Sequence, residues 1–390
     1  MDLALVNGRV MTDLGLQKGL AVVMSGDRIA AVGPAKDVPA NLARHDLEGG
    51  LLLPGFIDIQ VNGGGGQLFN DSPTPGAIAD IGAAHRRFGT TGFLPTLISD
   101  ELAVVGQAIA ATREAIRRGV TGVLGAHIEG PYINTEKKGI HDAAKLRRMD
   151  NAGLDLLTSL GVGRTLVTLA PEIAGPAMIA RLASAGVVVS AGHTNASFAQ
   201  ATAALDAGLT GFTHLFNAMS QIASRAPGVV GAALTDPRSW CGIIVDGQHV
   251  DPVVLKLALK CRPLDRFMLV TDAMPCVGTD LKTFTLQGKK ITVRNGACFD
   301  ERGRLAGSDL DMGQAVRNAV SLLGVSLADA SRMASRNPAE FLGLGAELGR
   351  IAKSYRADLV LLDEDLAVRR TWIGGALPED AHVLASAGNG

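Results

Sequence analysis

The chain has 390 residues, of which 47% are hydrophobic, so it can bury a large core and is too long for one minimal domain. Its 37 Lys and Arg residues nearly balance 38 Asp and Glu residues, which argues against an extended polyanion-binding surface. Aromatic residues make up only 4% of the chain, so stacking platforms for nucleic acid are not expected.

Short strand-like runs occupy both ends of the chain. Near the start, ALVNGRVMT, LAVVMSGDRIAAVG and HDLEGGLLLPG alternate β-forming residues with Gly and Asn turns. Near the other end, ADLVLLDEDLAVRRTWIGG has the same character. Because chain termini often lie close together, we expect a small β-sandwich domain built from residues 1–53 and 346–390.

The middle of the chain alternates apolar strand-like runs with helix-like segments such as PGAIADIGAAHRRFG and DPVVLKLALKCR, the latter with Asp251 as its expected N-cap. Eight buried parallel strands alternating with helices predict an α/β fold, a TIM-like (β/α)8 barrel over residues 54–345. The run after Asp272 predicts a β-hairpin insertion near residues 281–305. The eight runs are FIDIQV, GFLPTL, GVLGAHIEG, TLVTLAPE, GVVVSAGH, GFTHLF, CGIIVDG and RFMLVTDA.

Polar residues gather at the C-terminal ends of these runs, which form the active-site face of such a barrel. A histidine that only fills the core has no reason to prefer that end. The residues are Gln60, Asn62, Glu129, Glu172, His193, His214, Asp246 and Asp272.

Glu129, His193 and His214 are the strongest candidates for metal ligands. One carboxylate and two imidazoles leave an open position on a tetrahedral Zn²⁺, as a catalytic metal requires. Each histidine alone is better interpreted as a satisfied buried side chain, but three candidates at successive strand ends favour a metal site. We expect one divalent ion per subunit, with zinc first and iron, cobalt or manganese also compatible.

Asp272 and His141 are candidates for the chemistry beside that metal. Asp272 could cap a helix, but its position at a strand end favours a general base toward the attacking water and then an acid toward the leaving amine. His141 could polarise the scissile carbonyl or be an exposed loop histidine, and the local sequence leaves both open. The glycines of residues 62–66 are better interpreted as a tight turn than as a phosphate loop.

Arg225 and His249 are better candidates for an anion site, although each residue type alone is more often a solvated surface side chain.

The four cysteines bear on whether the chain is held by disulfide bonds. Cys241, Cys261, Cys276 and Cys298 form no CxxC pair, which argues against a disulfide framework. No secretory leader or run of membrane length is evident, so we expect a cytoplasmic protein with no membrane or nucleic-acid partner.

These motifs together resemble the N-acetylglucosamine-6-phosphate deacetylase family of the amidohydrolase superfamily. HIEGPYIN followed by THLFNAM is specific to that family, whereas PGFID marks only the wider superfamily. The resemblance runs over nearly the whole chain, through LPGFIDIQVNGGGG, HIEGPYIN, GHTNAS, THLFNAM, DGQHV, VTDAM and LAGSDL.

The resemblance implies hydrolysis of the acetamide of N-acetylglucosamine 6-phosphate to glucosamine 6-phosphate and acetate. It makes Asp272 the catalytic acid/base and His141 the histidine at the acetyl carbonyl. It also implies a homodimer in which Arg225 and His249 reach the phosphate across the interface. The implied metal ligands are Glu129, His193 and His214, and the implied sugar-phosphate contacts are Asn217, Ala218, Arg225 and His249.

One departure from the superfamily pattern bears on the number of metals. The first strand usually ends in H-x-H, but here it reads Gln60-Val61-Asn62, and amides are poor zinc ligands. Within the resembled family this version goes with a single metal. Two alternatives stay open: another amidohydrolase, either a cyclic amidase or a deaminase, and a non-catalytic barrel that serves as a scaffold.

Overall fold

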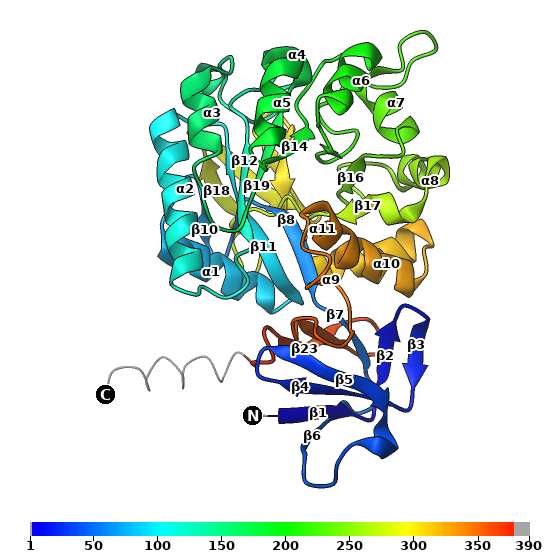
Figure 1. The fold of residues 1–390 in the computed structure, drawn as a ribbon. Coiled ribbons are helices and arrows are strands. Elements are labelled where there is room, and N and C mark those ends of the chain that lie inside the picture. The colour runs from blue at the N-terminus through cyan, green and yellow to red at the C-terminus, as the bar shows by residue number, and fades with distance from the viewer. Residues whose placement is uncertain (1, 378–390) are drawn as a thin grey trace, which may run out of the picture.

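The structure is a computed structural model that describes residues 2–377, and it has two parts (Figure 1). The larger part is a barrel of strands surrounded by helices. The smaller part lies below it and combines the blue N-terminal strands with the red C-terminal strand β23 (Val368–Trp372). The predicted small domain extends to residue 390, and its last residues, 378–390, lie outside the described part.

The barrel confirms the predicted α/β fold. Its eight strands follow the order β17-β16-β15-β14-β13-β12-β11-β8, and each neighbouring pair is parallel. The two edge strands meet through the backbone bonds from Asp272 N to Gln60 O (3.0 Å) and from Asn62 N to Ala273 O (2.9 Å). The strands are β8 (Phe56–Val61), β11 (Thr90–Ile98), β12 (Gly125–Glu129), β13 (Arg164–Leu169), β14 (Val188–Ala191), β15 (Gly211–Phe212), β16 (Trp240–Ile243) and β17 (Phe267–Leu269).

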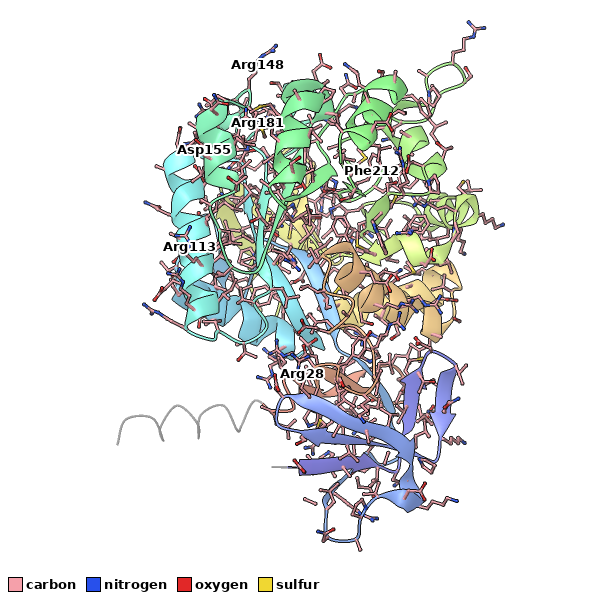
Figure 2. All side chains as sticks on the ribbon, viewed as in Figure 1. Arg28, Arg113, Arg148, Asp155, Arg181 and Phe212 are labelled. Atoms are coloured by element: carbon pink, nitrogen blue, oxygen red, sulfur yellow. The ribbon has the colours of Figure 1, made fainter. Side chains whose placement is uncertain are left out.

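The barrel strands are apolar on both faces because helices cover the outside and side chains fill the inside. All six residues of β8 are buried, and Phe212 of β15 is 1% exposed within the body of the barrel (Figure 2). Charged residues such as Arg113, Asp155 and Arg181 lie on the outer helices (Figure 2). The amphipathic pattern of the sequence therefore corresponds to the two sides of the helical layer.

Helix α8 (Pro252–Cys261) begins where the sequence predicts. Asp251 caps α8 by accepting a hydrogen bond from Val253 N at 2.7 Å. Among the described helices, none is long and apolar enough to cross a membrane. The helices are α1 (Pro75–Arg86), α2 (Leu102–Arg117), α3 (Asn151–Leu157), α4 (Pro171–Ala174), α5 (Pro176–Ser184), α6 (Phe198–Asp206), α7 (Gly228–Thr235), α8 (Pro252–Cys261), α9 (Met312–Asn318), α10 (Leu327–Ala334) and α11 (Arg336–Phe341).

The small domain is built from both ends of the chain, as predicted. One sheet has the order β5-β4-β1-β6, and the other has the order β23-β22-β7-β2-β3. A separate apolar core that includes Leu5, Leu52 and Trp372 stabilises it. The strands not yet named are β1 (Asp2–Val6), β2 (Arg9–Thr12), β3 (Gly15–Lys18), β4 (Leu20–Ser25), β5 (Arg28–Pro34), β6 (Ala43–Asp46), β7 (Leu51–Pro54) and β22 (Leu359–Leu362).

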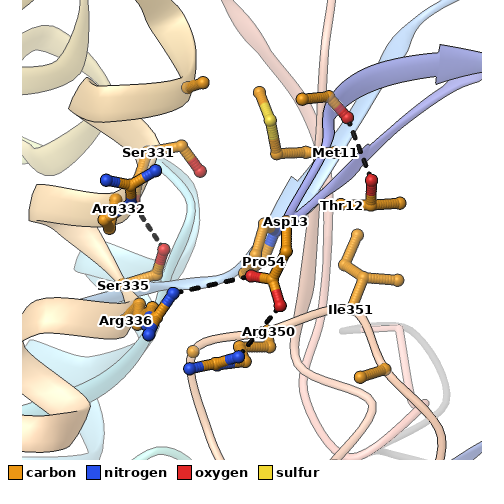
Figure 3. A pocket seen from close by; sticks show the side chains of 14 residues that line it. Met11, Thr12, Asp13, Pro54, Ser331, Arg332, Ser335, Arg336, Arg350 and Ile351 are labelled. Carbon is orange, nitrogen blue, oxygen red and sulfur yellow. Dashed lines mark hydrogen bonds and ion pairs between the residues drawn. The ribbon is translucent and has the colours of Figure 1, made fainter.

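An ion-pair network joins the small domain to the barrel (Figure 3). Asp13, in the turn between β2 and β3, lies 2.9 Å from Arg350 and 3.6 Å from Arg336 of α11. Glu340 accepts a hydrogen bond from the other side of Arg336 at 2.7 Å. The cavity between these residues measures only about 70 Å³, and it lies away from the candidate metal ligands described below.

The region predicted as a hairpin is larger than a hairpin. It is a four-stranded antiparallel sheet in which each strand pairs with the next along the chain. Its own apolar core includes Leu286, Ile291 and Cys298. The strands are β18 (Thr283–Leu286), β19 (Lys289–Arg294), β20 (Ala297–Asp300) and β21 (Leu305–Ser308).

Candidate active site

Three side chains from three barrel strands converge at the C-terminal face. The ligand atoms of Glu129, His193 and His214 all lie within 4.8 Å of one another. His214 Nε2 lies 3.0 Å from Glu129 Oε1 and 3.1 Å from His193 Nε2. Glu129 ends β12, whereas the histidines each follow a strand by two residues, so the barrel geometry brings the three together.

The chain bends sharply at the two histidines. His193 has φ of 48° and His214 has φ of 35°, both in the left-handed region that non-glycine residues seldom occupy. Asp272 shares this conformation, with φ of 53°. Such backbone costs on the order of 1–3 kcal/mol per residue and persists where surrounding contacts over-determine it, commonly at functional sites.

The donor atoms suit a divalent cation. The Nδ1–H of His193 donates to the backbone carbonyl of Lys137 at 2.8 Å, so its Nε2 lone pair faces Glu129 and His214. Two imidazole nitrogens and a carboxylate oxygen then face one another, and there are too few N–H groups for every pair to be hydrogen-bonded. A cation between them would satisfy all three, and this donor set is typical of zinc and similar ions.

Glu129 is held in its charged form. Burial by itself raises its pKa, but the neighbouring His193 and His214 side chains outweigh burial and lower the pKa of Glu129 well below its usual range. A ligand that stays ionised at neutral pH is available to a cation without losing a proton first.

Two amides replace the histidine pair at the end of β8, and both contact Asp272. Asn62 Nδ2 donates to Asp272 Oδ1 at 2.7 Å, and Gln60 Nε2 donates to the same oxygen at 3.1 Å. Gln60 Nε2 also lies 3.3 Å from each Glu129 oxygen. Gln60 therefore presents its amino group to the acidic groups and acts as a donor between them.

Asp272 is partly buried where the two edge strands of the barrel meet. Burial raises the pKa of Asp272, and the negative charge of Glu129 raises it further. Its backbone is also fixed, because Ser308 N of β21 donates to Asp272 O at 2.9 Å. A carboxylate with a raised pKa beside a candidate cation site can both accept and return a proton.

His141 is buried, with 2% exposure, so the exposed-loop alternative for this residue is wrong. Its ring centroid lies 4.4 Å from that of His193. Ser99 N donates to His141 Nδ1 at 3.3 Å, which leaves the ring proton on Nε2. Burial, followed by the nearby His193, lowers the pKa of His141 well below its usual value, so the ring is a neutral donor.

The glycine run after β8 is a tight turn, as expected. Strands β9 (Gly63–Gly64) and β10 (Gln67–Leu68) form its short ribbon. A Cβ on Gly63 would lie 2.4 Å from Gln67 O and 2.8 Å from Pro275 N, so only glycine fits there. This turn fixes the backbone directly after Asn62, whose side chain donates to Asp272.

The candidate sugar-phosphate contacts fall into two groups. Asn217 and Ala218 lie in the turn after His214, where Asn217 N donates to His214 O at 3.0 Å. His249 Nδ1 lies 2.5 Å from Asp246 Oδ2. Asn217 and Ala218 therefore lie beside the candidate ligand His214, and Asp246 orients the ring of His249.

Arg225 is the exception among the predicted residues. It lies in a run of exposed residues, 221–227, and among the described residues no hydrogen bond or ion pair joins it to the metal-ligand cluster. Within the described part of the chain, the structure therefore does not bring Arg225 to the other predicted residues.

Sequence reasoning missed several supporting groups. Ser99, which contacts His141, directly follows β11, so the strand-end rule applied one residue further would have found it. Gln287, in the β18–β19 turn, donates to Ser99 O at 2.6 Å and accepts from Asp142 N at 2.7 Å. No local signal in the sequence indicates that this turn would reach the loop of His141.

Comparison with known proteins agrees with this geometry. A model described as the amidohydrolase family matches residues 51–377, and one described as the NagA composite domain matches residues 3–52. The chain is 41% identical over 371 residues to the N-acetylgalactosamine-6-phosphate deacetylase of Shewanella sp. (strain ANA-3), covering 95% of this chain and 94% of that protein.

Two further relatives extend the comparison. The N-acetylglucosamine-6-phosphate deacetylase of Haemophilus influenzae is 35% identical over 383 residues, covering 97% of this chain and all (100%) of that protein. The crystal structure of N-acetylglucosamine-6-phosphate deacetylase from Pasteurella multocida superposes with a TM-score of 0.93 at 37% identity, covering 96% and 99% of the two chains. The similarity thus extends over both parts of the fold.

Proposed function

The chain belongs to the amidohydrolase family, and from this premise we propose that it removes the acetyl group from N-acetylglucosamine 6-phosphate. The products are glucosamine 6-phosphate and acetate. It is an enzyme, a carbon–nitrogen hydrolase that acts on a linear amide. The convergence of Glu129, His193 and His214 beside Asp272 is the observation that carries this proposal.

The family implies a divalent metal, and Glu129, His193 and His214 would hold it. When bound, such an ion supplies Lewis-acid chemistry: it stabilises negative charge on oxygen and lowers the pKa of water. Zinc fits this donor set best, while iron, cobalt and manganese are compatible. Gln60 and Asn62 direct their amino groups at Asp272, and this supports one ion rather than two.

The chain's own residues account for the proton transfers. Asp272 accepts a proton from the attacking water and returns it to the leaving amine. Gln60 and Asn62 hold Asp272 Oδ1, which leaves its second oxygen for that proton. The neutral His141 donates through Nε2 toward the acetyl carbonyl, where negative charge develops.

The phosphate would be bound at the rim of the barrel. His249, oriented by Asp246, is a candidate phosphate contact that we expect to act across the subunit interface. Asn217 and Ala218 are placed for the sugar, and these contacts supply remote binding energy.

We assign Arg225 to the phosphate of a neighbouring subunit. Its loop is exposed, and Ile222 beside it is 58% exposed. Val253 and Leu257, one helical turn apart on α8, are 63% and 59% exposed. Exposed apolar residues of this size favour a covered surface, and a homodimer would supply both the cover and the phosphate contact.

An acetate-release assay tests the proposed function. Metal-loaded protein should act on N-acetylglucosamine 6-phosphate and much less on the unphosphorylated sugar. N-acetylgalactosamine 6-phosphate is the second candidate substrate, because the Shewanella relative carries that name. Acetate release from neither phosphorylated sugar would contradict the deacetylase assignment and favour another amidohydrolase.

A further inference from the structure

Glu172 lies just after β13, the fourth barrel strand, but the proposed reaction gives it no part. It is the second residue of α4, and its carboxylate accepts hydrogen bonds from two loops that flank the metal-ligand cluster. One loop follows β12 and contains Asn134. The other follows β14 and contains Thr194 and Asn195.

The Glu172 carboxylate accepts three hydrogen bonds. Thr194 Oγ1 donates to Oε2 at 2.6 Å, and Asn195 N donates to Oε1 at 2.7 Å. Asn134 Nδ2 also donates to Oε1, at 2.9 Å. One carboxylate therefore connects two loops whose residues are far apart in the sequence, through bonds that are strong because the acceptor is charged.

Both loops act directly on the candidate ligand His193. Asn134 N donates to His193 O at 2.9 Å, and Lys137 O accepts the Nδ1–H of His193 at 2.8 Å. Thr194 follows His193 in the chain, and its hydrogen bond to Glu172 holds the backbone on the C-terminal side of His193. His193 has φ of 48°, a conformation that requires such outside support.

The hydrogen bonds around Glu172 also extend to the turn after His214 and to the loop that contains His141. Thr194 N donates to Ala218 O at 3.0 Å, in the turn that follows His214. The loop of Asn134 and Lys137 continues to His141, whose ring lies 4.4 Å from that of His193. A shift of Glu172 would therefore move His193 first and its neighbours with it.

We propose that Glu172 is a positioning residue: its carboxylate clamps the loops after β12 and β14 and so fixes the orientation of His193 as a metal ligand. This inference rests on the proposed function, because it assumes that His193 binds a metal. An ordinary alternative is that Glu172 serves only α4, as an acidic residue in the first helical turn.

Zn²⁺ affinity of the metal-free protein, measured by competition with a chromophoric chelator, separates the two explanations. Glu172→Gln should weaken Zn²⁺ binding by about ten- to hundredfold, the usual effect of losing a group that orients a ligand. Thr194→Val, which removes one donor and keeps the side-chain shape, should weaken it by a smaller factor. The double variant should be no weaker than Glu172→Gln alone, because both changes break one contact.

Glu136→Gln is the matched control. Glu136 accepts from Asn195 Nδ2 at 2.9 Å in the same region, but it is exposed and contacts neither Thr194 nor Asn134 through its carboxylate. Its Zn²⁺ affinity should stay within about twofold of the parent, since exposed polar pairs contribute little. The visible spectrum of Co²⁺-loaded Glu172→Gln should also change, because it reports ligand geometry rather than stability.

Several outcomes would overturn the clamp. Parent-like Zn²⁺ affinity in Glu172→Gln would do so, as would full additivity with Thr194→Val. If Glu172→Gln does not fold, Thr194→Val decides alone, and an unchanged affinity there rejects the proposal. Failure of the parent protein to bind Zn²⁺ or release acetate would instead reject the proposed function.

Discussion

Asp272 shows how two hydrogen bonds and burial adapt one carboxylate to proton transfer. Two amides donate to a single oxygen, at 2.7 Å and 3.1 Å, and burial raises its pKa. Asp272→Asn keeps that accepting oxygen but cannot take up a proton. Turnover should therefore fall by roughly two to four orders of magnitude, while metal content and the thermal midpoint stay close to the parent values.

Steady-state kinetics on metal-loaded Asp272→Asn protein, beside metal analysis, checks this expectation. Near-normal turnover would move the base elsewhere, and His141 would be the first residue to examine.

Asp58 predicts a pH dependence of stability. It is fully buried in β8, and burial raises its pKa from 3.8 to about 7 despite hydrogen bonds from Thr271. The unfolded chain ionises this group first, so its contribution to stability is complete below about pH 4 and is lost as the pH rises toward 7. At about 1.4 kcal/mol per pKa unit, the loss is on the order of 4 kcal/mol.

The side chain of Asp58→Asn cannot ionise, so this variant should not show the loss of stability that Asp58 causes as the pH rises. Denaturant unfolding of both proteins between pH 4 and 7 should show the variant gaining stability relative to the parent as the pH rises. Curves that stay parallel over this range would show that Asp58 has an ordinary pKa.

At the scale of elements, the glycine turn after β8 fixes the path of the chain where this first barrel strand ends. A Cβ on Gly63 would meet two backbone atoms at 2.4 Å and 2.8 Å, and backbone cannot move aside as a flexible side chain can. Gly63→Ala should therefore cost about 1–3 kcal/mol of stability and also lower turnover, because the turn positions Asn62.

Gly106→Ala, within α2, is the matched control. Its added methyl would meet nothing closer than Leu156 Cδ1 at 3.6 Å, an ordinary contact. This variant should be more stable than the parent by up to about 1 kcal/mol, since alanine favours the helix. Equal unfolding midpoints for the two variants would contradict the steric argument.

For the whole molecule, the first quantity to measure is the number of metals. We expect about one tightly bound equivalent per chain, because one cluster of three ligands is found among residues 2–377 and the amides of Gln60 and Asn62 face Asp272. Chelation should abolish turnover, and one equivalent of zinc should restore it. A requirement for two tightly held equivalents, shown by elemental analysis against activity, would contradict a single-metal site.

The second whole-molecule prediction concerns the subunits. If Arg225 serves a neighbouring site, inactive Arg225→Ala and Asp272→Asn proteins should rescue each other when mixed. One site of the mixed dimer carries both defects and the other carries neither. Activity should return toward about half of the parent value per mixed dimer as subunits exchange. Verified exchange without rescue would place Arg225 in the site of its own chain.

Much of the architecture could be predicted because it depends on local pattern. Eight apolar runs alternating with helical segments specify parallel strands covered on both faces, and turn-rich strands at both ends predicted the second domain. The insertion was underestimated, since β20 becomes a strand by pairing with β19, and the short glycine-containing β21 becomes one by pairing with β20.

The candidate metal ligands could also be predicted, because the carboxyl ends of parallel strands meet at one edge of the barrel. Glu129, His193 and His214 therefore converge wherever the strands pair in order. The strand-end pattern likewise indicated Glu172 and Asp246, but not what they contact.

The sequence by itself determined the strand–helix pattern and the residues available at the strand ends. Only the tertiary structure decided the partners of those residues: Lys137 O for His193, Ser99 for His141, and two loops for Glu172. It also decided that His141 is buried and that Arg225 is exposed. The physical reason is that these contacts join loops distant in sequence, whose conformations depend on packing rather than on local residue preference.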